Sequence, residues 1–124
     1  MKLTGRLAIL LMVATTTQAA DEDSRYVVWG MGQDSCNSYN LARAGNQSDE
    51  YWNYVAGYLT AYNAFAPDTY DIAGGKNREA MLSWLDDHCA DKQVGSISDA
   101  MHQFIEAHIE TRLRTVPGEG ARWP

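Results

Sequence analysis

The chain has 124 residues, with 10 basic and 16 acidic side chains and a net charge of −6 at pH 7. This length suits one domain and no more. Because binding to nucleic acid depends on the neutralisation of phosphates by Lys and Arg, an acidic chain without a basic cluster argues against a nucleic-acid partner.

The first 20 residues have the layout of a secretory signal peptide. Lys2 and Arg6 precede an apolar run over residues 7–14, and small residues follow, so that cleavage fits after Ala19 or after Ala20. The run is too short to span a bilayer, which disfavours an uncleaved membrane anchor. Cleavage leaves about 104 residues with 8 basic and 16 acidic side chains, a net charge of −8. We therefore expect a periplasmic or secreted protein that is not attached to a membrane after cleavage.

The mature part contains two cysteines, Cys36 and Cys89. In an exported protein an even pair predicts a disulfide, and two cysteines allow one intramolecular pairing. A domain of this size has a small stability margin, so the Cys36–Cys89 bond is expected to matter for folding.

Residues 21–34 are predicted to form an N-terminal arm. The arm begins with acidic residues and continues with the apolar segment 26–29, Tyr-Val-Val-Trp. This segment is expected either as a short strand or as an irregular stretch that lies on the domain. Gly30 and Gly32 argue against a helix there.

The first two helices are predicted over residues 35–44 and 48–65. Three residues share one face of the first helix by their spacing: Cys36, Tyr39 and Arg43. Ser48 is the expected cap of the second helix, whose apolar and aromatic residues follow i, i+3, i+4 spacing. Gly57 lies in the interior of that helix, where glycine costs about 1 kcal/mol relative to alanine, so we expect another helix to cross closely there.

Two further helices are predicted over residues 77–89 and 96–114. Asn77 is the expected cap of the third helix. Ser96, with Asp99 three residues later, resembles a capping box at the start of the fourth helix.

Residues 35–115 are thus predicted to form the helical domain, and residues 116–124, rich in Pro and Gly, a flexible tail. The expected fold is all-α, a small four-helix bundle with one disulfide.

Residues 51–63 contain four tyrosines and one tryptophan and no Asp, Glu, Lys or Arg. A domain this small must bury most of its apolar residues, so most of this aromatic band is expected in the core. The band covers more than half of the helix circumference, so some rings are expected to stay exposed and to contact a partner protein. The candidate contact residues are Tyr51, Trp52, Tyr58, Tyr62 and, on the third helix, Trp84.

Two segments have the residue types of metal or catalytic sites. In DDHCAD, residues 86–91, the possible ligands are adjacent on a helix and cannot all converge on one ion. His102, Glu106 and Glu110 follow i, i+4 spacing, which suits a cation but is more typical of a solvated helix surface. No nucleophile or phosphate-binding motif is present. We therefore predict no enzyme, no metal and no cofactor.

Three segments together resemble the HdeA/HdeB family of small periplasmic proteins: SCNSY at 35–39, YVAGYLTAYN at 54–63 and WLDDHC at 84–89. The resemblance implies a helical fold, a disulfide between Cys36 and Cys89, and an acid-activated chaperone that is a homodimer at neutral pH. In that family the dimer dissociates in acid and exposes apolar surface to unfolding clients. The charge of this chain is compatible, since protonation below about pH 3 would take the mature net charge from −8 to +11.

A second resemblance is to the Rap/Tai immunity proteins of type VI secretion systems, which are also small, periplasmic, helical and disulfide-bonded. It implies a protein that binds and inhibits a secreted cell-wall-degrading effector. An acidic surface with exposed aromatic residues would suit the capture of a basic enzyme. The sequence thus predicts a protein-binding protein and leaves two kinds of partner open, unfolded clients or one specific effector.

Overall fold

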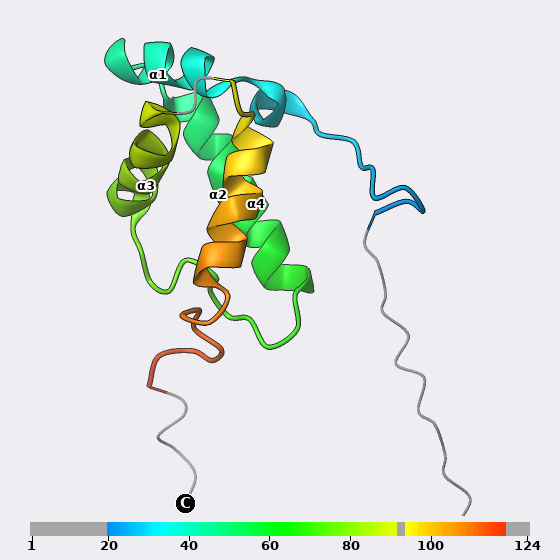
Figure 1. Ribbon diagram of the computed structural model, residues 1–124. Coiled ribbons are helices and arrows are strands. Elements are labelled where there is room, and N and C mark those ends of the chain that lie inside the picture. Colours follow the sequence, from blue (N-terminus) through cyan, green and yellow to red (C-terminus); the bar gives the residue numbers. More distant parts are fainter. Residues whose placement is uncertain (1–19, 92–93, 119–124) are drawn as a thin grey trace, which may run out of the picture.

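The computed structural model describes residues 20–91 and 94–118. All of the predicted signal peptide except Ala20, and residues 119–124 of the predicted tail, lie outside the described residues. The described part is helical, with no β-structure beyond two isolated bridges. In chain order the elements are η1 (Gly30–Gln33, a 3-10 helix), α1 (Cys36–Ala44), α2 (Asp49–Phe65), α3 (Arg78–Ala90) and α4 (Ile97–His108) (Figure 1). The predicted small all-α fold is confirmed.

All four α-helices contribute to one hydrophobic core. The residues that are fully or almost fully buried on α2 are Tyr51, Val55 and Leu59, and those on α4 include Ile97, Ala100, Met101 and Phe104. Ile72, from the loop between α2 and α3, is also completely buried. The i, i+3, i+4 pattern therefore predicted the buried face of α2 correctly. None of the helices in the described residues is long and apolar enough to cross a membrane.

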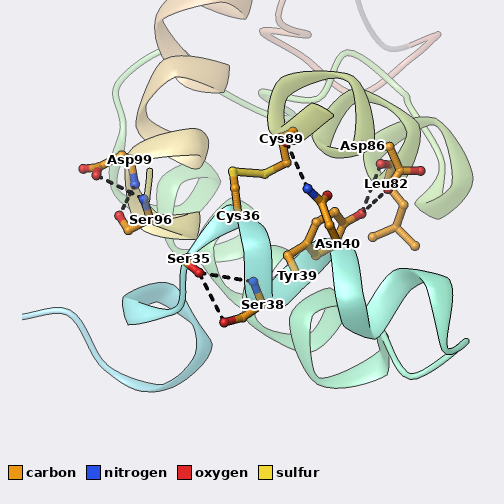
Figure 2. The surroundings of a disulfide bond; sticks show 10 residues. All are labelled: Ser35, Cys36, Ser38, Tyr39, Asn40, Leu82, Asp86, Cys89, Ser96 and Asp99. Atoms are coloured by element: carbon orange, nitrogen blue, oxygen red, sulfur yellow. Dashed lines mark hydrogen bonds between the residues drawn. A yellow bond between two sulfur atoms is a disulfide. The ribbon is translucent and has the colours of Figure 1, made fainter. Parts of the chain in front are cut away.

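The disulfide joins the first residue of α1 to the last turn of α3. The sulfur atoms of Cys36 and Cys89 are 2.05 Å apart, and both residues are completely buried. Figure 2 shows the bridge between the two helices, with Asn40 of α1 donating a hydrogen bond to the carbonyl of Cys89 at 3.0 Å. The predicted Cys36–Cys89 pairing is confirmed.

The starts of α1 and α4 are held together by their backbones. The N–H of Cys36 donates to the carbonyl of Gly95 at 2.8 Å, and the N–H of Ile97 donates to the carbonyl of Asp34 at 2.9 Å. At the start of α4, the hydroxyl of Ser96 accepts from the N–H of Asp99, and the carboxylate of Asp99 accepts from the N–H of Ser96. The predicted capping box is therefore present, and it satisfies backbone donors that the helix itself leaves free.

The other predicted caps have two different outcomes. Asn77 caps α3 as expected, since its side-chain oxygen accepts from the N–H of Ala80 at 2.9 Å. Ser48 occupies the cap position of α2 but its side chain makes no capping hydrogen bond. The acidic residues Asp49 and Glu50 in the first turn favour this helix end instead, because negative charge is stabilised near a helix N-terminus.

Helix α4 is shorter than predicted, because it ends at His108 and not at Arg114. The chain leaves the helix to pair with the loop that follows α2, where Asp71 and Leu113 exchange two backbone hydrogen bonds of 2.9 and 3.0 Å. The side chain of Arg112 also donates to the carbonyl of Asp68 at 3.0 Å. These tertiary partners satisfy backbone groups that would otherwise have continued the helix.

The arm differs from the prediction in one respect. Residues 26–29 form no strand pairing, so the irregular alternative is the correct one. The glycines were expected to prevent a helix, yet residues 30–33 form the 3-10 helix η1. Gly30 has a φ of +63°, a conformation that glycine adopts readily, and this turn starts the helix.

The predicted close helix crossing at Gly57 is wrong. A Cβ atom at Gly57 would have no neighbouring atom within 4 Å, whereas one at Gly32 would lie 2.2 Å from the hydroxyl oxygen of Tyr54. The close approach therefore occurs at η1, whose backbone packs against a tyrosine of α2.

This contrast predicts opposite effects for the same substitution. Gly57→Ala should raise the free energy of unfolding by about 1 kcal/mol, since glycine is a poor helix former. Gly32→Ala should lower it by about 1–3 kcal/mol, because the ring of Tyr54 must be displaced. Chemical denaturation of both variants measures the two effects, and a neutral Gly32→Ala would show that the ring moves aside without loss of packing.

Candidate functional site

The predicted contact residues differ in their access to solvent. Tyr51 is only 6% exposed and belongs to the core, so the prediction that it meets a partner does not fit this structure. Its hydroxyl donates to the carboxylate of Asp34, the residue that follows η1, at 2.8 Å, which satisfies the only polar atom of the side chain. The remaining candidates are half-buried and pack against the core: Trp52, Tyr58, Tyr62 and Trp84.

Trp52 links α2 to α3. The guanidinium carbon of Arg78 lies 5.6 Å from the centre of the Trp52 ring, a cation–π contact, and the same guanidinium pairs with the carboxylate of Asp49. One face of this indole is therefore already in contact with a charge of its own chain.

Trp84 has a packing role between α3 and α4. Its ring meets Phe104 edge-on at 5.0 Å and stacks with His88 at 5.1 Å, measured between ring centres. His108 stacks against Phe104 at 4.0 Å and meets the ring of Trp84 edge-on at 6.2 Å. The ring of Trp84 thus serves mainly the α3–α4 contact, in a cluster of aromatic residues with preferred edge and stacked geometries.

The most exposed group of neighbouring apolar side chains lies on the arm, where the sequence analysis named no contact residue. Tyr26 is 57%, Val27 73% and Trp29 79% exposed. The sequence signal was present as an apolar run between acidic residues and glycines, but nothing in it showed whether the run would pack on the domain. Other large apolar residues are exposed singly, on α1, α2, the loops and the tail: Leu41, Phe65, Tyr70, Val94 and Val116.

An open pocket of about 490 Å³, here called the arm pocket, lies between the arm and the helices. Its lining includes Ser24 and Tyr26 of the arm, His88 of α3 and, at the start of α4, Asp99, His102 and Gln103. Aromatic, imidazole, carboxylate and amide groups thus line one space.

The side chain of Asp86 connects α1 to α3 next to the disulfide. It accepts a hydrogen bond of 2.6 Å from the hydroxyl of Tyr39 and two from the guanidinium of Arg43, at 3.0 Å for Nε and 3.1 Å for Nη2 (Figure 2 shows Tyr39 and Asp86). The hydrogen bond to Asp86 raises the pKa of Arg43, and burial together with the same carboxylate raises the pKa of Tyr39. The predicted common face of Cys36, Tyr39 and Arg43 is therefore the face that meets α3.

Neither segment with metal-like or catalytic residue types forms such a site within the described residues. In 86–91, Asp86 is engaged with α1 and Cys89 is in the disulfide. His102 and Glu106 form an exposed contact of 3.4 Å on α4. No group of three or more His, Cys, Asp or Glu in residues 20–91 and 94–118 is arranged to hold a metal ion.

Tyrosine ionisation should destabilise the fold in alkali. Burial, and then the hydrogen bond to Asp34, raises the pKa of Tyr51 to about 12, and burial raises that of Tyr58 to about 12. The folded protein holds these protons more tightly than the unfolded chain, whose tyrosines titrate near the ordinary value of 10. The stabilisation is therefore complete below pH 10 and is lost as the pH rises through 12.

Denaturation at pH values from 9 to 12 tests this expectation. The free energy of unfolding should fall across this range, and Tyr51→Phe should fall less steeply than the wild type because it has no hydroxyl to ionise at that position. Equal slopes for the two proteins would contradict the assignment to Tyr51.

Comparison with known proteins finds no relative of this chain. No protein-family model matches it, and searches of curated proteins and of solved structures find no match.

Proposed function

We propose that the protein is an exported protein-binding protein of the acid-activated chaperone type. The observation that carries this proposal is the unequal way in which the helices are connected. The disulfide joins α1 to α3 covalently, whereas α2, which carries most of the tyrosines, is held only by packing and polar contacts. A disulfide does not respond to acid, so the two kinds of connection would respond differently to a fall in pH.

Carboxylates take part in the polar contacts that hold α2. Asp34 accepts from Tyr51, and Asp49 at the start of α2 pairs with Arg78 of α3. Below about pH 3 carboxylates are protonated, and the mature chain would carry a net charge of +11 in place of −8. Self-repulsion of this size favours an expanded state. The expected result is a chain that loosens around α2 while Cys36 and Cys89 keep α1 and α3 together.

Loosening would expose apolar surface that is covered at neutral pH. Tyr58 and Tyr62 are half-buried against the core, and Val55 and Leu59 of the same helix are buried in it. Large aromatic and aliphatic side chains on one helix form a surface to which unfolding proteins bind through their own apolar groups. This supports a chaperone whose binding surface is made available by acid.

Light scattering of an acid-sensitive client protein, measured at pH 3 and pH 7, tests the proposal. The protein should suppress aggregation at pH 3 only. Tyr58→Ser should weaken the suppression, whereas Leu41→Ser should leave it unchanged, because Leu41 lies on α1 and is 68% exposed without any opening. Suppression that is equal at both pH values would contradict acid activation.

A second candidate function is inhibition of one secreted effector, as in immunity proteins. It is favoured by the exposure of Val27 and Trp29 beside the acidic start of the arm, since this surface is available at neutral pH without any opening. A failure to suppress aggregation at any pH, together with tight binding of one protein from the same compartment, would favour this function.

A further inference from the structure

We infer that residues 26–29 form a docking strand, to which an extended, lysine-bearing edge segment of a partner protein adds as a second β-strand. This inference deepens the proposed protein-binding function, since it names a surface and a kind of partner for it. It depends on the arm and not on the aromatic face of α2.

The backbone of the docking strand has no regular structure of its own and is largely unpaired, and at Trp29, where it enters η1, it is in the extended region, with φ −110° and ψ 148°. It lies between a turn, in which the N–H of Asp21 donates to the carbonyl of Arg25 at 3.1 Å, and the 3-10 helix η1. Within the described residues, none of the four N–H groups of residues 26–29 donates a hydrogen bond, and the carbonyl of Val28 accepts one from the side chain of Gln33 at 2.6 Å. Backbone groups of this kind are the template on which another strand can pair.

The side chains of the docking strand alternate as those of a β-strand do. Val27 and Trp29 are 73% and 79% exposed, whereas Val28 is half-buried and Tyr26 lines the arm pocket. One face is therefore directed toward the domain and the other toward solvent. Valine, tyrosine and tryptophan are also the residue types that favour strands. The segment therefore has residue types and an exposure pattern that suit a strand, and no strand pairs with it in the described residues.

The arm pocket offers space beside this strand. Its lining combines Tyr26 and Ser24 of the arm with side chains from α3 and the start of α4. An extended peptide that paired with the docking strand on the side of the arm pocket would contact the side chains of the pocket as well as the backbone of the strand. Specificity in strand addition comes from such contacts to alternate side chains.

The charge around the docking strand favours a partner segment that carries lysine. Asp21, Glu22 and Asp23 precede it, and Asp99 lies in the arm pocket, where its carboxylate also accepts from the N–H of Ser96. Arg25 pairs with Asp21 at 3.0 Å and with Asp23 at 2.9 Å, so the surroundings of the strand keep a net negative charge. Exposed edge strands of natural proteins commonly carry lysine, which discourages pairing between them. Carboxylates next to the docking strand would attract such lysines, so that an edge strand protected by lysine from its own kind could still pair here. A second copy of this chain fits less well, because its arm would add a further set of carboxylates.

Titration of a fluorescently labelled synthetic peptide of alternating valine and lysine tests the inference at pH 7. A peptide with glutamate in place of lysine is the charge control. Val27→Pro removes one backbone donor and disfavours strand pairing, whereas Val27→Ala keeps the donor and removes the same side chain. We expect the lysine peptide to bind with saturation, the glutamate peptide to bind at least about tenfold more weakly, and Val27→Pro to lose about tenfold in affinity relative to Val27→Ala.

Both variants should fold, since residue 27 lies outside the core, and circular dichroism checks this. The inference is overturned if the lysine peptide does not bind, if both peptides bind equally, or if Val27→Pro and Val27→Ala bind alike. Self-association abolished by Val27→Pro, without peptide binding, would assign the strand to a second copy instead.

The aggregation assay at pH 3 separates this inference from the proposed function. If Val27→Pro suppresses aggregation normally and the peptide does not bind, the docking strand alone is wrong. If the peptide binds as expected and the wild type never suppresses aggregation, the acid-activated function alone is wrong.

Discussion

Replacement of both Cys36 and Cys89 by alanine should lower the free energy of unfolding by about 4 kcal/mol. The bond closes a loop with a sequence separation of 53 residues, and the loss of chain entropy that this imposes on the unfolded state corresponds to about 4 kcal/mol. Small domains have stabilities of about 5–15 kcal/mol, so this is a large share of the total. Chemical denaturation of the variant and of the wild type measures it.

Wild-type protein kept reduced is the matched control, because it keeps both sulfur atoms in the core and lacks only the bond. The variant and the reduced protein should lose similar stability. If the reduced protein were as stable as the oxidised one, the disulfide would have no role in stabilising the α1–α3 pair.

Phe104→Ala should lower the free energy of unfolding by about 3–5 kcal/mol. Phe104 is completely buried on α4, where its ring meets Trp84 and His108, and removal of the ring leaves a cavity in the core. The chain has two phenylalanines, and the other, Phe65, is 89% exposed at the end of α2.

Phe65→Ala is therefore a control that makes the same chemical change at an exposed position. It should change the stability by less than about 0.5 kcal/mol, as is usual for surface positions. Thermal and chemical denaturation of both variants gives the comparison. A similar loss at both positions would mean that Phe65 is covered in solution, by a partner or by a second copy of the chain.

The candidate contact surface was predicted only in part from the sequence. Residues of an aromatic helix can be divided into faces by their spacing, but which face the domain covers depends on what packs against it. Tyr51 was expected to be accessible and is buried, with its hydroxyl bonded to Asp34 of the arm, 17 residues earlier in the chain. Val27 and Trp29 were not named as contact residues, and they are the ones that the fold leaves uncovered.

Local chemistry in the sequence determined where α3 and α4 begin. Asn77, and Ser96 with Asp99, satisfy free N–H groups within a few residues of themselves, so their effect needs no knowledge of the rest of the chain. The same holds for the buried face of α2, whose period of 3.6 is a local property. The cysteine pairing was also determined, because two cysteines allow only one intramolecular bond.

Contacts between distant segments decided the rest, and only the tertiary structure contains them. Helix α4 stops at His108 because Leu113 finds backbone partners in Asp71, 42 residues earlier in the sequence. The tight glycine contact is at Gly32 and not at Gly57, because Tyr54 packs against η1. Local rules alone would have allowed α4 to continue beyond His108 and would have favoured a close contact at Gly57. The backbone groups of Asp71 and the ring of Tyr54, which come from elsewhere in the chain, decided otherwise.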